Sequence, residues 1–556
     1  MAACLLLLGT LLLLPPPTRA PCRVANSSEC RHVRRLVPGV GLAGEGVDVT
    51  SLRLSGSFPV DTHGSLWPNG SCTLCENTLQ QGALQRLPLA LTDWRIRGSS
   101  CQHRMVSTVS DSPEEVAQEV ANSIHNDWWA GLDVAPKLGT NLQVAVAGSH
   151  SQVANFVAQK MFRDQYSFST NLLECRLYSF RLVHNPPLHP DFRQALRALP
   201  PHFNASTEPN YLRLISNFGT HFIRAVELGG RVSAITALHT CQLALEGLTA
   251  DEVTHCLTAE ATVSIGGHAN FSKEVKECEE KKQKHKMAAS FHQAYRERHS
   301  EVVGGHHTAM HDLLFGGQAG PQQFLAWMTS LQDSPGLVGY SLEPLHVLLE
   351  GQDPRREALR RAVSSYVTDR ARWRDCSRPC PPGQQKSPKD PCQCVCHGSA
   401  VTNQDCCPRR RGLAQLEVTI VQAWNLWGDG ITATDAYVKV FFGGQELRTG
   451  IMWNKDNPRW MTQLDFGNVL LATQGPLRVQ VWDVDSGWDD DLLGSCDRRL
   501  IAQKLEVRDA CFLNQGFLEF MYKVTCAPHL RGAKCLQYRP QGVLGELPGN
   551  RSGAVW

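Results

Sequence analysis

The C-terminal part of the chain alternates apolar and polar residues in short stretches. Leu416 to Ile420 and Leu477 to Val481 each place an aliphatic side chain at every second position, and turn-rich segments lie between them. This combination is typical of antiparallel strands that bury one face. The pattern predicts an antiparallel β-sandwich of about 110 residues over residues 412–525, followed by a tail at 526–556.

Residues 262–272 alternate over a length that could cross a bilayer. Val263, Ile265, Ala269 and Phe271 share one side, and polar residues occupy most of the other. A membrane-spanning strand needs about 9 to 11 such residues. An ordinary strand followed by a solvated helix explains the segment equally well, because the charged run 273–286 and apolar residues at helical spacing come next. A glycan on the sequon at Asn270 would also oppose crossing.

A second alternating candidate lies within residues 143–186, at positions 166–169 and 178–182. Two other segments have helical signals. Ser112 is a predicted N-cap with Pro113 at the first helical position, and Val116, Val120 and Ile124 form an apolar stripe. Residues 353–374 carry apolar side chains at helical spacing, which predicts a linker helix.

The N-terminus and the charge balance indicate a secreted protein. Residues 1–20 are rich in leucine and end in Thr-Arg-Ala, which is typical of a signal peptide. No later apolar run reaches 18 residues, so we expect a mature protein that is soluble when made. The chain has 55 basic and 53 acidic residues, so its charge does not favour nucleic-acid binding.

Cysteines and sequons favour the same route. After Cys4 in the signal, 20 of the 21 cysteines remain, which predicts disulfides rather than metal ligands in an oxidising compartment. No cysteine pairs show zinc-finger spacing with histidine partners. The predicted glycosylation sites are Asn26, Asn69, Asn204 and Asn550.

Residues 211–230 carry a distinctive arrangement. Tyr211 precedes the run Gly219, Thr220, His221 and Phe222, and the pair Gly229-Gly230 follows. Two adjacent glycines suit a bend, a positive φ or a close backbone approach, although a strand that ends in a turn would also use them.

The arrangement resembles the signature of the membrane attack complex/perforin family. The resemblance implies an α+β fold for residues 21–375, with a bent antiparallel sheet like that of the cholesterol-dependent cytolysins and flanking helical clusters. In that family, two helical clusters refold into amphipathic hairpins. The segments at 143–186 and 262–304 are the candidates here.

Seven cysteines lie between Cys376 and Cys407, and the first six resemble an EGF-like module at 376–407. The resemblance implies the pairs Cys376–Cys392, Cys380–Cys394 and Cys396–Cys406. Cys407 is then left over. The preceding group of nine cysteines is also odd in number, and Cys241 is the expected partner. A generic disulfide knot is the alternative.

Acidic residues gather where strands leave the sandwich. Asp483 and Asp485 continue the parity of the strand 477–481, further aspartates follow at 489–491, and a second acidic loop spans 428–435. Crowded carboxylates repel one another unless a cation lies among them, and Ca²⁺ takes roughly six to eight oxygen ligands. The EF-hand pattern fails at Gly487, and a solvated acidic loop is the alternative.

These loops resemble those of a C2 domain, a calcium-dependent phospholipid-binding module. The resemblance implies Ca²⁺ as cofactor, with carboxylates from Asp429, Asp435, Asp483, Asp485, Asp489, Asp490 and Asp491. It also allows backbone carbonyls from Gly428, Thr432 and Ala433. Trp427, Ile431 and Trp488 lie in the same loops, and we expect them to enter the bilayer interface.

The order of modules resembles a granule-stored pore former of cytotoxic lymphocytes within that family. This implies calcium-dependent docking on a phospholipid bilayer, assembly into a homo-oligomeric ring, and insertion as a transmembrane β-barrel. It further implies secretion from cytolytic, lysosome-like granules and passage of granule proteases (granzymes) through the target-cell plasma membrane. The alternative is a secreted calcium-dependent membrane adaptor that never inserts. We find no hydrolase or phosphate-loop motif, so an enzyme is not expected.

Overall fold

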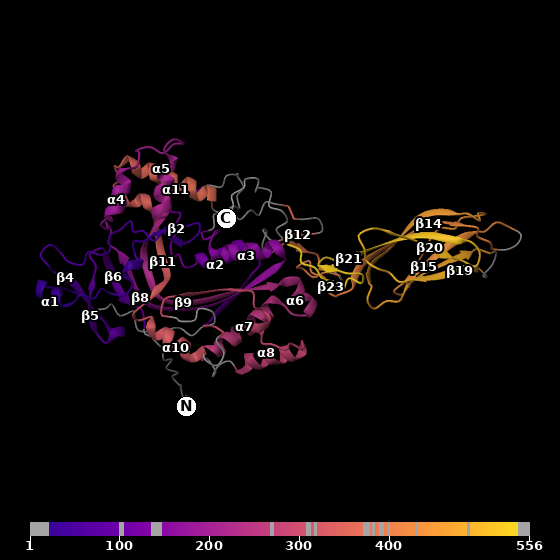
Figure 1. Ribbon diagram of the computed structural model, residues 1–556, viewed down its shortest axis with the longest axis horizontal. Helices are drawn as coiled ribbons and strands as arrows, with labels where there is room; N and C mark the ends of the chain where they lie inside the picture. The colour runs from indigo at the N-terminus through magenta and orange to yellow at the C-terminus, as the bar shows by residue number, and fades with distance from the viewer. Residues whose placement is uncertain are drawn as a thin grey trace, which may run out of the picture. The chain divides into compact units, whose positions relative to one another are not determined.

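The computed structural model describes residues 22–98, 105–134, 147–266, 272–306, 313–315, 320–370, 379–380, 384–388, 394–398, 401–428, 432–485 and 490–542. The chain divides into two compact units. The first comprises residues 1–160, 167–238 and 250–377, and the second comprises residues 161–166, 239–249 and 378–556. The predicted class, antiparallel sheets with flanking helices and a C-terminal sandwich, is confirmed (Figure 1).

The first unit is built on an antiparallel sheet of eight strands in the described residues. Its main path runs β3 (Arg53–Leu54), β2 (Gly46–Asp48), β9 (His221–His239), β8 (Tyr166–Leu182) and β6 (Leu91–Ile96). β10 (Arg298–Val303) and β11 (Gly336–Pro344) pair with β9, and β7 (Val106–Ser110) pairs with β8. With 17 and 19 residues, β8 and β9 hold the sheet together.

Helices cover both faces of this sheet (Figure 1). Thr170 of β8 donates a 3.0 Å hydrogen bond to Glu119 of α2 (Pro113–Ala121). The next residue, Asn171, donates a 2.8 Å bond to Thr258 of α7 (Ala250–Ser264). Successive strand residues point to opposite faces, so α2 and α7 lie on opposite faces. The other helices of this unit are α3 (Gln152–Arg163), α4 (Pro190–Arg197), α5 (Glu208–Phe218), α8 (Ser272–Lys284), α9 (Phe291–Ala294), α10 (Gly320–Ser330) and α11 (Pro354–Arg370).

Two predicted helices are present. Ser112 caps α2, because its hydroxyl accepts the Glu115 amide at 3.2 Å, and Pro113 begins the helix. α2 ends at Ala121, so Ile124 lies beyond it. α11 occupies most of the predicted linker helix, and Leu359, Val363 and Val367 bury its apolar face.

In this structure, the described part of the segment 262–272 is not a strand. Thr262 to Ser264 form the end of α7, and residues 267–271 lie outside the described part of the chain. The helix tolerates β-branched residues because the hydroxyls of Thr258 and Thr262 each donate to the carbonyl four residues earlier, at 2.8 Å. The disulfide Cys256–Cys278 joins α7 to α8.

The second alternating segment also differs from its prediction. Tyr166 to Leu182 form β8, a central strand that pairs with β9, β6 and β7, so this part of 143–186 already belongs to the sheet. Its alternation arises because Tyr166 and Phe168 share the face toward α2, whereas Ser167 and Ser169 share the face toward α7. The helical part of this segment in the described residues is α3.

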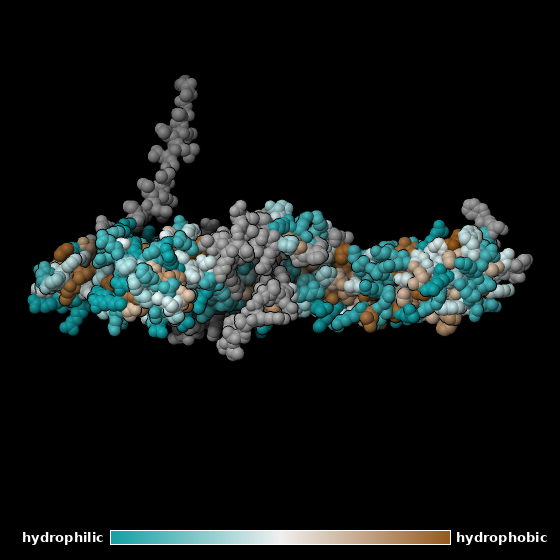
Figure 2. Space-filling view, turned by 90° about the horizontal axis from the view of Figure 1, so that it is seen from above, coloured by the Kyte–Doolittle hydropathy of each residue, from teal (hydrophilic) through white to brown (hydrophobic). Residues whose placement is uncertain are grey.

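The surface of the molecule is mostly hydrophilic in the face that Figure 2 shows, with hydrophobic side chains at scattered points. Among the helices in the described residues, none is both long enough and apolar enough to cross a membrane.

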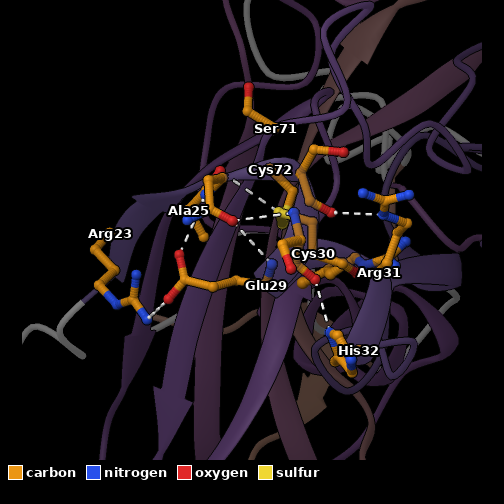
Figure 3. The surroundings of a disulfide bond; sticks show 12 residues. Arg23, Ala25, Glu29, Cys30, Arg31, His32, Ser71 and Cys72 are labelled. Carbon is orange, nitrogen blue, oxygen red and sulfur yellow. Dashed lines mark hydrogen bonds and ion pairs between the residues drawn. A yellow bond between two sulfur atoms is a disulfide. The ribbon is translucent and has the colours of Figure 1, made fainter.

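A small sheet at the start of the first unit holds one predicted glycosylation site. β1 (Cys22–Ala25), β4 (Cys72–Asn77) and β5 (Ala83–Leu87) pair in that order, and the disulfide Cys22–Cys75 joins β1 to β4. A second disulfide, Cys30–Cys72, joins α1 (Ser27–His32) to β4 (Figure 3). The Asn26 side chain caps α1 by accepting the Glu29 amide at 2.9 Å. Asn26, Asn69 and Asn204 are exposed, as a glycan requires, whereas Asn550 lies outside the described residues.

The second unit contains the cysteine-rich segment. β12 (Gln384–Lys386) pairs with β13 (Cys394–Cys396), and the structure contains the expected disulfides Cys380–Cys394 and Cys396–Cys406. Cys407 pairs with Cys241, which lies in α6 (Thr240–Glu246), also as expected. The pair Cys376–Cys392 falls outside the described residues.

The predicted sandwich consists of two four-stranded antiparallel sheets. One has the order β17 (Arg459–Leu470), β14 (Leu413–Trp424), β21 (Phe517–Cys526) and β20 (Val507–Phe512). The other has the order β16 (Gln445–Arg448), β15 (Ala436–Phe442), β18 (Leu477–Asp483) and β19 (Asp491–Arg498). Alternate aliphatic residues of β14 and β18 face one shared core.

The C-terminal tail is fastened to a buried carboxylate within the second unit. A short pair of strands, β22 (Leu530–Arg531) and β23 (Gln537–Tyr538), carries Tyr538, which donates a 2.6 Å hydrogen bond to Asp164. His239 lies 2.9 Å from the same carboxylate, and the Gln541 amide donates at 3.0 Å. Burial opposes ionisation of Asp164, but these hydrogen bonds and His529 lower its pKa below the usual range.

Candidate functional site

The signature residues form the junction between α5 and β9. Gly219 ends α5 with φ +78°, and a side chain there would lie 2.5 Å from the backbone of Val47 in β2. The next residue, Thr220, is also held to β2, because its amide donates a 2.9 Å hydrogen bond to the Val47 carbonyl. Tyr211, within α5, is fully buried and donates a 2.6 Å hydrogen bond to the Pro200 carbonyl. These residues fix the end of α5 against β2 of the sheet.

His221 is buried at the start of β9. Its Nε2 lies 2.9 Å from the Trp128 carbonyl, which can only accept, so Nε2 carries the proton. Nδ1 is then an acceptor that faces the Thr220 hydroxyl at 2.8 Å. Burial lowers the pKa of His221 to about 4. The histidine is therefore neutral at physiological pH. Its hydrogen bond to the Trp128 carbonyl holds the backbone at Trp128 against the start of β9.

Gly229 and Gly230 lie within β9, which continues to His239, so the alternative of a strand that ends in a turn is wrong. Neither has a positive φ. What requires glycine is close approach. A Cβ at Gly229 would lie 1.9 Å from the Cys175 carbonyl of β8, and one at Gly230 would lie 2.6 Å from Trp327 of α10.

The contact between α7 and β8 is polar. Ser169 and Asn171 lie on the same face of β8, and Asn171 bonds to Thr258. Ser169 is fully buried and its hydroxyl has no hydrogen-bond partner. The hydroxyl of Thr254, one turn before Thr258, is also buried without a partner. Each such group costs about 1 to 3 kcal/mol, so this layer is held less firmly than an apolar core of equal area.

The acidic loops leave one end of the sandwich. Asp483 ends β18 and is only 4% exposed, and its Oδ1 accepts the Asp435 amide at 2.6 Å. A Cβ at Gly428 would lie 1.6 Å from Asp483 Oδ2, so the backbone of the first loop requires glycine beside this carboxylate. Asp435 in turn accepts the Asn454 amide at 2.6 Å. The two predicted loops therefore converge, as the sequence indicated.

The remaining predicted ligands divide between described and undescribed residues. Asp490 accepts a 2.8 Å bond from Tyr437, whose pKa is raised to about 12 by burial and by this carboxylate. Asp491 begins β19 opposite Asp483. Thr432, Ala433 and Asp485 are also described, whereas Asp429, Ile431, Trp488 and Asp489 are not. Within the described residues, no three histidine, cysteine, aspartate or glutamate side chains converge closely enough to hold a metal.

The donors nevertheless fit a hard cation, since they are carboxylates and backbone carbonyls, and the absence of a side chain at Gly428 lets the Asp483 carboxylate lie against the first loop. Sequence reasoning missed the loop 452–458. Asp456 accepts the Thr434 amide at 3.0 Å and so ties this loop to the first one. Trp453 at its tip is 60% exposed, much like Trp427 at 58%. An exposed tryptophan beside an Asn-Lys-Asp-Asn turn was the available signal.

Known families match three successive parts of the chain, which correspond to the large sheet with its helices, the cysteine-rich segment and the sandwich. A family described as the MAC/Perforin domain matches residues 38–375. A family described as "Perforin-1-like, EGF domain" matches residues 375–409, and the C2 domain family matches residues 414–509.

Relatives over the full length are also known. Perforin-1 of Homo sapiens is 70% identical over 557 residues and perforin-1 of Mus musculus is 62% identical over 556 residues, each covering 100% of both chains. The complement component C8 alpha chain of Oryctolagus cuniculus is 26% identical over 249 residues, which is 43% of this chain and 41% of that protein.

Proposed function

The chain belongs to the membrane attack complex/perforin family, and from that membership we propose that it is a secreted, pore-forming cytolytic protein. In this proposal it docks on phospholipid bilayers with Ca²⁺, assembles into a homo-oligomeric ring and inserts amphipathic hairpins as a transmembrane β-barrel. Closure into a barrel satisfies every backbone hydrogen bond in lipid, which an open sheet cannot do.

The polar contact between α7 and β8 carries this proposal. Helices that must leave a sheet should be held by few apolar contacts, and here an amide–hydroxyl hydrogen bond from Asn171 to Thr258 joins α7 to β8, with unpartnered buried hydroxyls at Ser169 and Thr254 nearby in the sequence. Once α7 leaves, the uncovered face of β8 would present polar side chains that suit a water-filled lumen. An apolar contact at this position would oppose both steps.

The two helices α7 and α8 are expected to move together. The disulfide Cys256–Cys278 crosses between them, and Lys281 of α8 forms an ion pair with Glu252 of α7 at 2.9 Å. α8 is highly charged, with lysines and glutamates in most of its positions. Such a segment has little apolar surface to hold it on the sheet, which favours release as one hairpin.

Docking is assigned to the loops at the end of the sandwich. Asp435, Asp483, Asp485, Asp490 and Asp491, with Asp429 and Asp489, would hold Ca²⁺ there. The backbone carbonyls of Gly428, Thr432 and Ala433 would contribute further oxygens. Bound Ca²⁺ would neutralise these carboxylates and attract lipid phosphates. Trp427, Ile431 and Trp488 would then enter the interface.

The proposal extends to the cellular setting through the full-length relatives. The protein would be stored in acidic cytolytic granules, where protons compete with Ca²⁺ for the carboxylates, and would act at the plasma membrane of a target cell. The cargo would be granule proteases, the granzymes. No enzymatic activity is proposed for the chain itself.

Release of dye from phosphatidylcholine vesicles tests the proposal. Purified protein with Ca²⁺ should release the dye, and chelation of Ca²⁺ before addition should prevent release. Vesicle binding without release would favour the adaptor instead, because an adaptor docks and never inserts.

A covalent lock tests the role of α7 separately. Asn171 and Thr258 touch across the contact, so the double variant Asn171→Cys/Thr258→Cys should tie α7 to β8 when oxidised. We expect normal calcium-dependent docking, loss of dye release and recovery on mild reduction. Each single cysteine variant serves as the control. Dye release by the fully oxidised double variant would show that α7 need not leave the sheet.

A further inference from the structure

The hairpin between β20 and β21, residues 512–517, exposes an uncharged aromatic surface. Its sequence is Phe-Leu-Asn-Gln-Gly-Phe. Phe512 is 78% exposed. The Phe517 ring lies between Phe512 and Trp424, with ring centroids 6.3 Å and 4.6 Å away respectively. Single exposed apolar residues are common on protein surfaces, but here three rings adjoin one another in a stretch without charge.

The hairpin lies at the end of the sandwich that carries the acidic loops. Phe517 pairs with Trp424, the last residue of β14, directly before the first loop. Gly516 has φ +75°, and a side chain there would lie 2.1 Å from the Trp424 carbonyl. The hairpin backbone is therefore pressed against the base of the first loop.

A second attachment fixes the other side of the hairpin. The Asn514 amide donates a 3.1 Å hydrogen bond to the Leu493 carbonyl of β19. β19 begins at Asp491, one of the predicted calcium ligands. The hairpin thus has a set position between the bases of both acidic loops, and whatever surface the loops approach, the hairpin approaches as well.

We propose that this hairpin is a further membrane-contacting element, with Phe512 at the bilayer interface when the acidic loops dock. The inference rests on the proposed calcium-dependent docking and adds a residue outside the loops to it. Aromatic rings are favoured at the interface, where one side meets apolar chains and the other meets water. The hairpin has no charged group that would have to lose its hydration on contact.

The chain offers a matched control for this proposal. Leu505 is 79% exposed, almost the same as Phe512, and lies just before β20 begins at Val507. Phe512 ends the same strand. The two side chains therefore lie at opposite ends of one strand in one domain, with equal exposure and opposite expected distance from the membrane.

The experiment measures calcium-dependent binding of the full chain to phosphatidylcholine vesicles by flotation. Phe512→Ser should weaken binding about tenfold, since burial of a phenylalanine in the interface is worth at least that factor. Leu505→Ser should change it less than about twofold, and Phe512→Trp should retain it. Both serine variants replace exposed side chains, and their unfolding temperatures should match that of the parent protein.

The outcomes separate the role of the hairpin from calcium-dependent docking itself. If the parent protein binds vesicles with Ca²⁺ and Phe512→Ser weakens that binding no more than Leu505→Ser does, the role of the hairpin is overturned and calcium-dependent docking is left intact. No calcium-dependent binding by the parent would overturn both. If Phe512→Ser binds vesicles normally but releases less dye, the hairpin contacts another copy of the chain rather than lipid, and the proposal fails.

Discussion

Acidification should destabilise the first unit through His221. The histidine is fully buried, and burial lowers its pKa to about 4, against about 6.5 in an unfolded chain. As pH falls from 7 to 5, the unfolded chain takes up a proton at this position and the folded chain does not. The stability that the neutral histidine provides is therefore present above about pH 6.5 and is lost between that pH and about 4.

The magnitude follows from the two pKa values. Proton uptake by the unfolded state alone lowers the free energy of unfolding by about 2 kcal/mol between pH 7 and pH 5. The buried His346, whose pKa is also lowered to about 4 by burial and by Arg356 and Arg360, acts in the same direction. Other groups add their own pH dependence, so a comparison of variants is needed to isolate His221.

The assay is hydrogen exchange in denaturant on the full chain, followed in peptides from β9 at pH 7 and pH 5. His221→Gln keeps a donor for the Trp128 carbonyl and an acceptor for Thr220 but cannot titrate. The variant should lose about 2 kcal/mol less than the parent over this pH range. His63→Gln, at a histidine whose side chain is 79% exposed, is the control and should behave like the parent. An equal loss in parent and His221→Gln would refute the reasoning.

Three further predictions follow from contacts described above. Gly229→Ala should lower the unfolding temperature of the first unit strongly, because the new Cβ meets a backbone carbonyl that cannot move aside, whereas Gly41→Ala, with no atom within 4 Å, should have little effect in calorimetry. Asp483→Ala should abolish calcium binding in titration calorimetry. The parent protein should bind Ca²⁺ more weakly at pH 5 than at neutral pH, since protons compete for the carboxylates. Unchanged calcium affinity in either experiment would contradict the assignment of the calcium site. Asp164→Asn should expose the C-terminal tail to limited proteolysis, because the charged acceptor for Tyr538 is lost, and unchanged protection would argue against its fastening role.

Sequence patterns predicted the elements whose burial is simple. β14 and β18 alternate because one face meets the shared core and the other meets water, and α11 shows helical spacing because it buries one stripe. The acidic loops could be located because they continue the strand parity into Asp483. In each case the spacing of apolar residues along one element reflects a single buried interface.

Patterns failed where one segment meets several neighbours or where contacts join distant positions. β8 has aromatic residues on one face and serine and asparagine on the face toward α7, so its alternation resembled that of a membrane strand. Residues 262–264 alternate but form a helix, because threonine hydroxyls bond within the helix and Cys256 is tied to α8. The contact of Asp456 with Thr434, 22 residues away, leaves no local signal.

The disulfide between Cys241 and Cys407 constrains how the protein is made. The two cysteines are separated by 166 residues. During synthesis at about 5 to 20 residues per second, Cys241 waits roughly 8 to 33 s before its partner is even translated. Throughout that interval earlier cysteines are available for wrong pairing. Correct oxidation therefore depends on α6 folding and burying Cys241, or on an isomerase that undoes the wrong pair, before the cysteine-rich segment arrives.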